Sequence, residues 1–204
     1  MNLKMIVLDK SLLINQGTVR ACYHHPDDRS LVVKVPTGSK NDRDQANAIE
    51  LKGYQDLMQK HKALMCISHC HGFEPTNMGE GLLCDCIYDA NGSVSKSILD
   101  LINSKNPPEF SYLKKVVEQF TQYLLDEKIY IFDLNVKNIV MQQQSDASYK
   151  PIIIDLKGHC ELKEFIPLSR YIPYFRRKKL ERRCRQLLER TEMYWEKRTI
   201  VKEE

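Results

Sequence analysis

The strongest constraint on how this chain can fold comes from residues 133–140, Asp-Leu-Asn-Val-Lys-Asn-Ile-Val, where polar and apolar residues are interleaved. The apolar pair that follows Asn138 anchors the stretch in a core, so Asp133 and Asn138 are held rigidly and not on a mobile tip. The apolar run 151–155 is typical of a buried strand that ends on a carboxylate, Asp155, seventeen residues after Asn138. We therefore expect three fixed polar side chains beside an apolar core.

This stretch resembles the catalytic loop of protein kinases, and Asp155 resembles the acidic residue of their metal loop. In phosphoryl transfer, magnesium neutralises the charge of the γ-phosphoryl group, so an Asn oxygen and a carboxylate bind the metal. A separate Asp orients the incoming hydroxyl and accepts its proton. The resemblance implies Asp133 as the catalytic residue and Asn138 and Asp155 as the Mg²⁺ ligands. Lys137 is also assigned as a catalytic residue, because it lies close to Asp133 in the sequence.

A second motif lies upstream. Lys34 is the lone charged residue in the apolar run 31–35, and Glu50 follows sixteen residues later on a predicted helix. A Lys on a buried strand needs an anionic partner to offset its desolvation. Kinases place their nucleotide Lys and its Glu in the same order. We expect Lys34 to bind the α- and β-phosphates and Glu50 to orient it, while Gly17 stands where a glycine-rich loop would approach phosphate.

Taken in order, these motifs resemble the YrbL family of PhoP regulatory network proteins, within the protein-kinase-like superfamily. The resemblance covers roughly residues 13–189. Besides the residues above, it rests on Cys22-Tyr23, His25-Pro26-Asp27-Asp28, Val33, Val35, Leu51-Lys52, Tyr54, Tyr88-Asp89, Gly92 and Gly158. The motif Asp133-Leu134-Asn135 is similar to that of bacterial kinases that phosphorylate lipopolysaccharide sugars, so the resemblance makes a sugar hydroxyl a candidate acceptor.

We expect an α+β, protein-kinase-like two-lobed fold with a reduced C-lobe. Residues 1–88 form the N-lobe of strands plus one helix, 89–170 the reduced helical C-lobe, and 171–204 a basic C-terminal helix. The resemblance implies ATP and Mg²⁺ in the cleft between the lobes. Periodicity of apolar residues predicts helices over 44–61, 93–104 and 110–128, and strands over 14–23, 31–35, 70–74, 81–88 and 151–155.

Departures from the kinase pattern keep a second function open, a pseudokinase-like regulatory module that binds nucleotide or a partner. Ile131 and Phe132 replace the usual His-Arg before the catalytic Asp, and only Gly17 remains of a glycine loop. After Gly158 only 46 residues follow, too few for the helical platform that holds a peptide, so we expect a non-peptide acceptor. An adaptor for lipid or nucleic acid, with a vestigial cleft, is a further alternative.

The positive charge is local. The whole chain carries a net charge of only +4, yet residues 170–190 hold nine Lys/Arg against two Glu. The stretch from Arg176 to Arg185 is interpreted either as a solvated helix face or as a surface for an anionic membrane or glycan. Nucleic acid ranks last, because no recognised binding module accompanies the charge. The flanking aromatic residues Tyr171, Tyr174, Phe175 and Trp195 suit either interfacial anchoring or packing.

Seven cysteines, an odd number, favour a reducing compartment and a cytoplasmic protein, with peripheral attachment to the inner membrane as an alternative. No apolar run is long enough for a membrane span, and we expect no signal peptide. The segment 66–71, Cys-Ile-Ser-His-Cys-His, together with Cys84 and Cys86 could be read as a zinc site. Its irregular spacing favours buried free cysteines and ordinary histidines.

Overall fold

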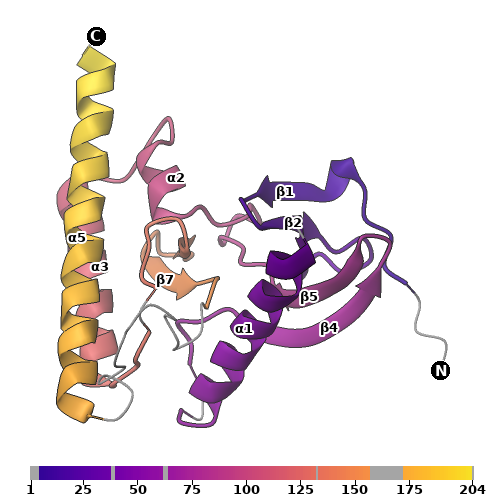
Figure 1. The fold of residues 1–204 in the computed structure, drawn as a ribbon. Helices are drawn as coiled ribbons and strands as arrows, with labels where there is room; N and C mark the ends of the chain where they lie inside the picture. The colour runs from indigo at the N-terminus through magenta and orange to yellow at the C-terminus, as the bar shows by residue number, and fades with distance from the viewer. Residues whose placement is uncertain (1–4, 38–39, 62–63, 132, 157–171, 204) are drawn as a thin grey trace. The chain divides into compact units, whose positions relative to one another are not determined.

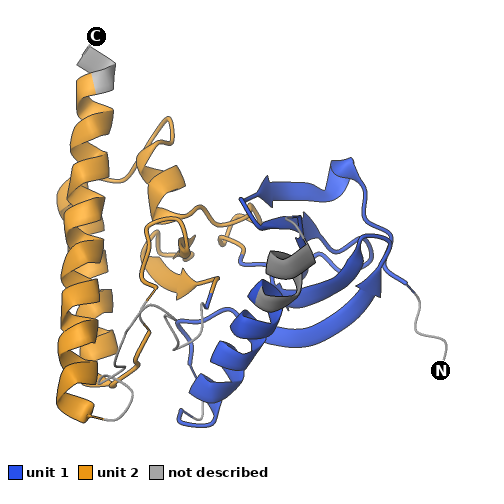
Figure 2. Cartoon of the chain, in the orientation of Figure 1, with its two compact units in different colours: residues 1–87, 156–158 blue, residues 88–155, 159–204 orange. Residues whose placement is uncertain are grey.

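The computed structural model describes residues 5–37, 40–61, 64–131, 133–156 and 172–203. It divides the chain into two compact units, residues 1–87 with 156–158 and residues 88–155 with 159–204 (Figure 2). The fold is mixed α+β, as expected, with a mainly antiparallel sheet and four α-helices in the described residues.

A five-stranded antiparallel sheet in the order β1-β2-β3-β5-β4 forms most of the first unit (Figure 1). A 3-10 helix, η1 (Lys10–Leu12), precedes it, and helix α1 (Lys40–Met58) connects β3 to β4. The strands are β1 (Leu13–Gln16), β2 (Arg20–His24), β3 (Leu31–Pro36), β4 (Cys70–Thr76) and β5 (Gly79–Asp85). The single strand expected over 14–23 is thus two strands, because the chain turns back at Gly17, whose N–H donates to the carbonyl oxygen of Arg20 (2.8 Å).

Strand β3 is buried on both faces, which explains its almost unbroken apolar run. Val33 and Val35 belong to a core cluster on one side of the sheet, together with Ile6, Leu8, Ala21, Tyr23 and Leu83. Residues alternate between the faces of a strand, so Lys34 points to the other side. Helix α1 packs against β3, β4 and β5.

The buried side of α1 differs from the one that the apolar pattern predicts. Tyr54 and Leu57 are buried as expected, but Ile49 is 39% exposed. The buried stripe continues instead through two polar residues, Asn47 and Glu50, each 2% exposed. Spacings of three and four residues put all four on one helix face. Hydrogen bonds and ion pairs satisfy the polar members, so they can replace apolar residues there.

The second unit holds helices α2 (Ile98–Ile102), α3 (Phe110–Asp126) and α5 (Pro173–Glu203) and the hairpin of β6 (Ile139–Gln143) with β7 (Tyr149–Ile153). The helix expected over 93–104 shrinks to α2, which starts where the Ser97 hydroxyl accepts the Asp100 N–H (3.1 Å). The strand expected over 151–155 ends at Ile153, two residues before Asp155.

Helices α3 and α5 lie side by side (Figure 1). Leu180, Cys184 and Leu187 are buried and form the apolar seam of α5, whereas Leu188 is only partly buried. Near the other end of the pair, the rings of Phe110 and Trp195 stack at 5.1 Å between centroids. Trp195 is therefore partly buried and packs against α3 within this unit.

Candidate functional site

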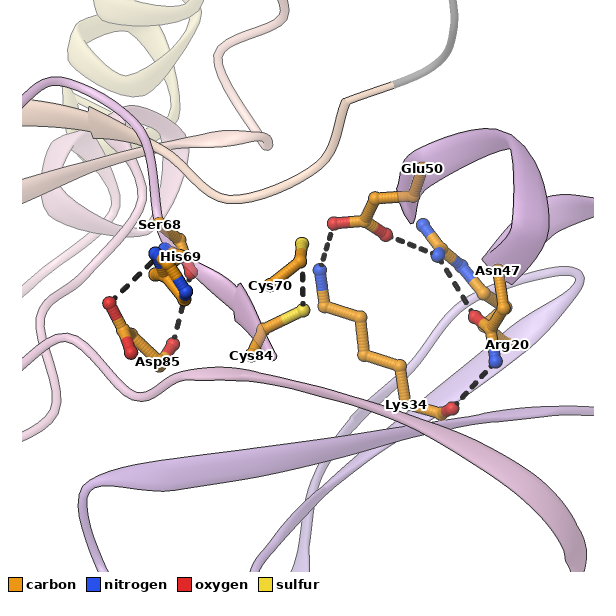
Figure 3. A network of polar contacts seen from close by, with 9 residues as sticks. All are labelled: Arg20, Lys34, Asn47, Glu50, Ser68, His69, Cys70, Cys84 and Asp85. Atoms are coloured by element: carbon orange, nitrogen blue, oxygen red, sulfur yellow. Dashed lines mark hydrogen bonds and ion pairs between the residues drawn. The ribbon is translucent and has the colours of Figure 1, made fainter. Parts of the chain in front are cut away.

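A buried ion pair joins β3 to α1. The ammonium nitrogen of Lys34 lies 2.6 Å from Oε1 of Glu50, and the two side chains are only 10% and 3% exposed (Figure 3). The sequence paired these two residues, and the structure brings them together. Removing both charges from water is costly, so close contact is the condition for burying either of them.

Two residues that the sequence reasoning missed complete this cluster. Nη1 of Arg20, on β2, contacts the second oxygen of Glu50, so the carboxylate binds one cation on each oxygen (Figure 3). Asn47 lies one turn before Glu50 on α1; its Oδ1 accepts from Arg20 (3.1 Å) and its Nδ2 donates to the carbonyl oxygen of Lys34 (2.8 Å). The spacing of three residues between Asn47 and Glu50 was the available signal.

Gly17 forms the turn between β1 and β2. An added Cβ there would lie 3.5 Å from the carbonyl oxygen of Arg20, which is an ordinary contact. The fold itself therefore does not require glycine at this position. A need for glycine would come only from a ligand that approaches the turn.

In the second unit, the polar loop before β6 is a tight turn shaped by Asn135. The side-chain oxygen of Asn135 accepts the Lys137 N–H (3.1 Å), and its backbone carbonyl accepts the Asn138 N–H (2.9 Å). Leu134 and Val136 are buried and hold the loop in the core. The Lys137 side chain is exposed. Asn135 thus has a structural role that its resemblance to sugar kinases did not indicate.

The β6–β7 hairpin brings two predicted site residues to the same edge. The Ile154 N–H donates to the carbonyl oxygen of Asn138 (3.0 Å), and Asp155 is the next residue along the chain. Asn138, Asp155 and Asp133 are all partly buried. Gly158, with which the resemblance continues this loop, lies outside the described residues.

The match to a known family covers most of the chain. A sequence profile described as PhoP regulatory network protein YrbL matches residues 6–192. The chain belongs to the YrbL family. Among family relatives, the proteins named "Uncharacterized protein YrbL" in Escherichia coli (strain K12) and in Shigella flexneri are each 27% identical to it over 179 residues, 87% of this chain and 84% of theirs.

A shorter match lies outside the YrbL family. An ATP-dependent helicase/nuclease protein of Clostridium botulinum (strain Alaska E43 / Type E3) is 33% identical over 102 residues. The match spans 50% of this chain but only 7% of that protein, so it carries no argument about function.

Other residues that carried the YrbL resemblance shape the backbone. Asp89 accepts hydrogen bonds at one oxygen from the Ser95 hydroxyl (2.6 Å) and the Gln143 N–H (2.8 Å), and so fastens its turn to β6. Gly92 has φ of +81°, a conformation that side chains disfavour. These two positions of the YrbL pattern therefore have a structural reason in this chain.

The cysteines and histidines do not gather in the arrangement that the zinc alternative suggested. His71 Nε2 contacts Asp85 Oδ1 (2.7 Å), and His69 contacts the Tyr54 hydroxyl. Within the described ranges, one compact group of possible metal donors occurs, made of Glu50, Cys70 and Cys84, with one ligand atom of each within 4.8 Å of the others. It does not include the histidines.

The basic start of α5 is mostly exposed. Arg177 and Lys178 pair with Glu181 at 3.1 and 2.9 Å, which is the behaviour of a solvated helix face. Arg176 lies over the ring of Tyr130, and Tyr174 is 63% exposed. Of the helices in the described parts of the chain, none is both long and apolar enough to cross a membrane.

Proposed function

We propose that this chain is a protein-kinase-like phosphotransferase that moves a phosphoryl group from ATP, with magnesium, to a hydroxyl acceptor. The observation that carries the proposal is the buried contact between Lys34 on β3 and Glu50 on α1. In protein kinases the Lys of the third strand pairs with a Glu of the following helix. A five-stranded antiparallel sheet with one helix between β3 and β4 is consistent with this architecture.

The remaining residues offer suitable chemistry. An amide oxygen and a carboxylate are ligands that Mg²⁺ prefers, and Asn138 and Asp155 supply them from the same edge of one hairpin. The ammonium group of Lys34 suits the α- and β-phosphates. The donor set therefore fits ATP with Mg²⁺, and bound magnesium would neutralise charge that develops on the transferred phosphoryl group.

Asp133 is assigned the role of positioning the acceptor. Its carboxylate is proposed to orient the acceptor hydroxyl for in-line attack and to accept the hydroxyl proton. Lys137, exposed four residues later, would contact the γ-phosphate. The family resemblance in 133–135 supports a sugar or another non-peptide hydroxyl compound as the acceptor.

Binding is tested first. ATP with Mg²⁺ should raise the thermal midpoint of the wild-type chain, and calorimetry should give a measurable Kd. Lys34→Met keeps the side-chain length and removes the charge, and it should weaken ATP binding about tenfold or more, since a charged hydrogen bond contributes roughly 1.5–3 kcal/mol. Lys52→Met, at an exposed position of α1, is the matched control and should bind ATP like the wild type. Equal Kd values in both variants would remove Lys34 from the site.

Catalysis is tested second, and it separates the kinase from the pseudokinase. Release of phosphate from ATP that is radiolabelled at its γ-phosphate should occur slowly without an added acceptor. Asp133→Asn should abolish it with ATP affinity unchanged, whereas Asp126→Asn, at the exposed end of α3, should leave it intact. Hydrolysis that persists in Asp133→Asn would favour the pseudokinase-like binding module.

A further inference from the structure

Two thiols lie in contact beside the buried ion pair. The sulfur atoms of Cys70, on β4, and Cys84, on β5, are 3.3 Å apart. The two sulfur atoms lie next to the Lys34 ammonium group, on the side of the sheet where it meets the Glu50 carboxylate (Figure 3). Both cysteines are buried, at 6% and 1% exposure. Neither thiol has a part in the proposed phosphotransfer.

The backbone places this pair where a covalent bridge can form. Cys70 and Cys84 are directly opposite one another in the antiparallel register. The Asp85 N–H donates to the carbonyl oxygen of His69 (2.9 Å), so the neighbouring cysteine pair occupies a non-hydrogen-bonded position. At such positions the Cα atoms lie about 4.5 Å apart, which is within the range of roughly 4.4–6.8 Å for bridged cysteines. An irregularity of β4 between Cys70 and Gly72 lets the strand adjust.

We propose that Cys70 and Cys84 form an oxidisable dithiol, which a peroxide converts to an intramolecular disulfide next to Lys34 and Glu50. Cys70, the more exposed of the two, attacks one peroxide oxygen; an S–O bond forms, the O–O bond breaks, and water leaves with the thiol proton. Cys84 then attacks the sulfenic sulfur; the S–S bond forms, the S–O bond breaks, and a second water leaves. Two thiols are oxidised and one peroxide is reduced to two waters.

The surroundings favour a bridge over a bound metal. Glu50 already binds Arg20 and Lys34, one on each carboxylate oxygen, so a metal would have to displace a cation. The hydrogen bond between the two thiols, and then burial, raise the pKa of Cys70 above its ordinary value, which disfavours the thiolates that a metal needs. The same effect makes the reaction with peroxide slow, so millimolar peroxide is appropriate for the test.

Formation of the disulfide should also displace the ion pair between Lys34 and Glu50. The sulfurs must approach from 3.3 Å to about 2.05 Å, which requires β4 and β5 to shift slightly. Lys34 pairs with Leu82 on β5, two residues from Cys84. If the proposed function holds, the bridged protein should bind ATP with Mg²⁺ several-fold more weakly, and dithiothreitol should restore the affinity.

The bridge is tested by peptide mapping of the full chain. The protein is treated with hydrogen peroxide and then unfolded in denaturant with N-ethylmaleimide, which blocks the free thiols, and linked peptides are identified by mass spectrometry before and after dithiothreitol. A Cys70–Cys84 link is expected in the wild type and in Cys86→Ala, which removes a buried cysteine two residues from Cys84. In Cys70→Ala, Cys84 should stay alkylatable. Alkylation of both thiols after peroxide treatment, or stoichiometric zinc in the purified wild type that is lost in Cys70→Ala, would overturn the proposal.

The peptide map tests the disulfide, and the ATP affinity tests its coupling to Lys34, so either part can be contradicted without the other. A linked protein whose ATP affinity equals that of the reduced protein would overturn the coupling to Lys34 and leave the bridge standing. Reduced protein that binds no ATP would count against the proposed function, and the peptide map would still decide on the bridge.

Discussion

At position 81 the sheet has room for a hydrogen atom and nothing larger. A Cβ on Gly81 would lie 2.5 Å from Cγ1 of Val33 and 3.0 Å from Cγ2 of Thr76. Both neighbours are β-branched and stiff at χ1, so they yield poorly. Gly81→Ala should therefore lower the free energy of unfolding by about 1–3 kcal/mol in urea denaturation. Gly17→Ala, with no contact closer than 3.5 Å, is the matched control and should change it by less than about 0.5 kcal/mol.

The negative charge of Glu50 is predicted to stabilise the first unit. Glu50→Gln removes the negative charge that faces both Lys34 and Arg20, whose side chains are 10% and 13% exposed. Breaking a buried ion pair on one side costs about 3 kcal/mol or more. Urea denaturation should show a loss of this size, and Glu80→Gln, at an exposed strand position, should show almost none. Equal stability of the two variants would mean that the cluster contributes little to the fold.

The contact between helices α3 and α5 is predicted to stabilise the second unit strongly. Leu187 of α5 has no exposed surface, whereas its neighbour Leu188 is partly exposed. Leu187→Ala should lower the free energy of unfolding by about 2–5 kcal/mol, because it leaves a cavity. Leu188→Ala is the matched control and should lose clearly less. Similar losses in chemical denaturation would show that α5 does not pack through the Leu187 face.

For the whole molecule, one buried and one partly buried thiol predict a loss of stability in alkali. Burial raises the pKa of Cys22 to about 11 and that of Cys184 to about 12, from an ordinary value of 9.0. Above pH 9 the unfolded chain releases these protons while the folded chain keeps them. The free energy of unfolding should therefore fall as the pH rises from 9 toward 11 or 12.

Urea denaturation at pH 7.5, 9 and 10.5 under reducing conditions measures this dependence. Other groups also titrate in this range, so the comparison is with the double variant Cys22→Ala/Cys184→Ala. Its stability should fall less steeply above pH 9 than that of the wild type. Parallel curves would contradict the role of the two thiols. Cys22 lies in the first unit and Cys184 in the second, so the two single variants show which unit the effect comes from.

The apolar periodicity of residues 110–128 was enough to anticipate α3, because it reflects spacing between neighbours in sequence, whereas the kinase resemblance paired Lys34 with Glu50. The tertiary structure alone decided that Glu50 also binds Arg20, that Asn47 replaces Ile49 on the buried face of α1, and that Cys70 faces Cys84. These contacts depend on strand register and on which helix face meets the sheet. Both are set by burial over long sequence distances, where hydrogen bonds can make a polar residue as suitable as an apolar one.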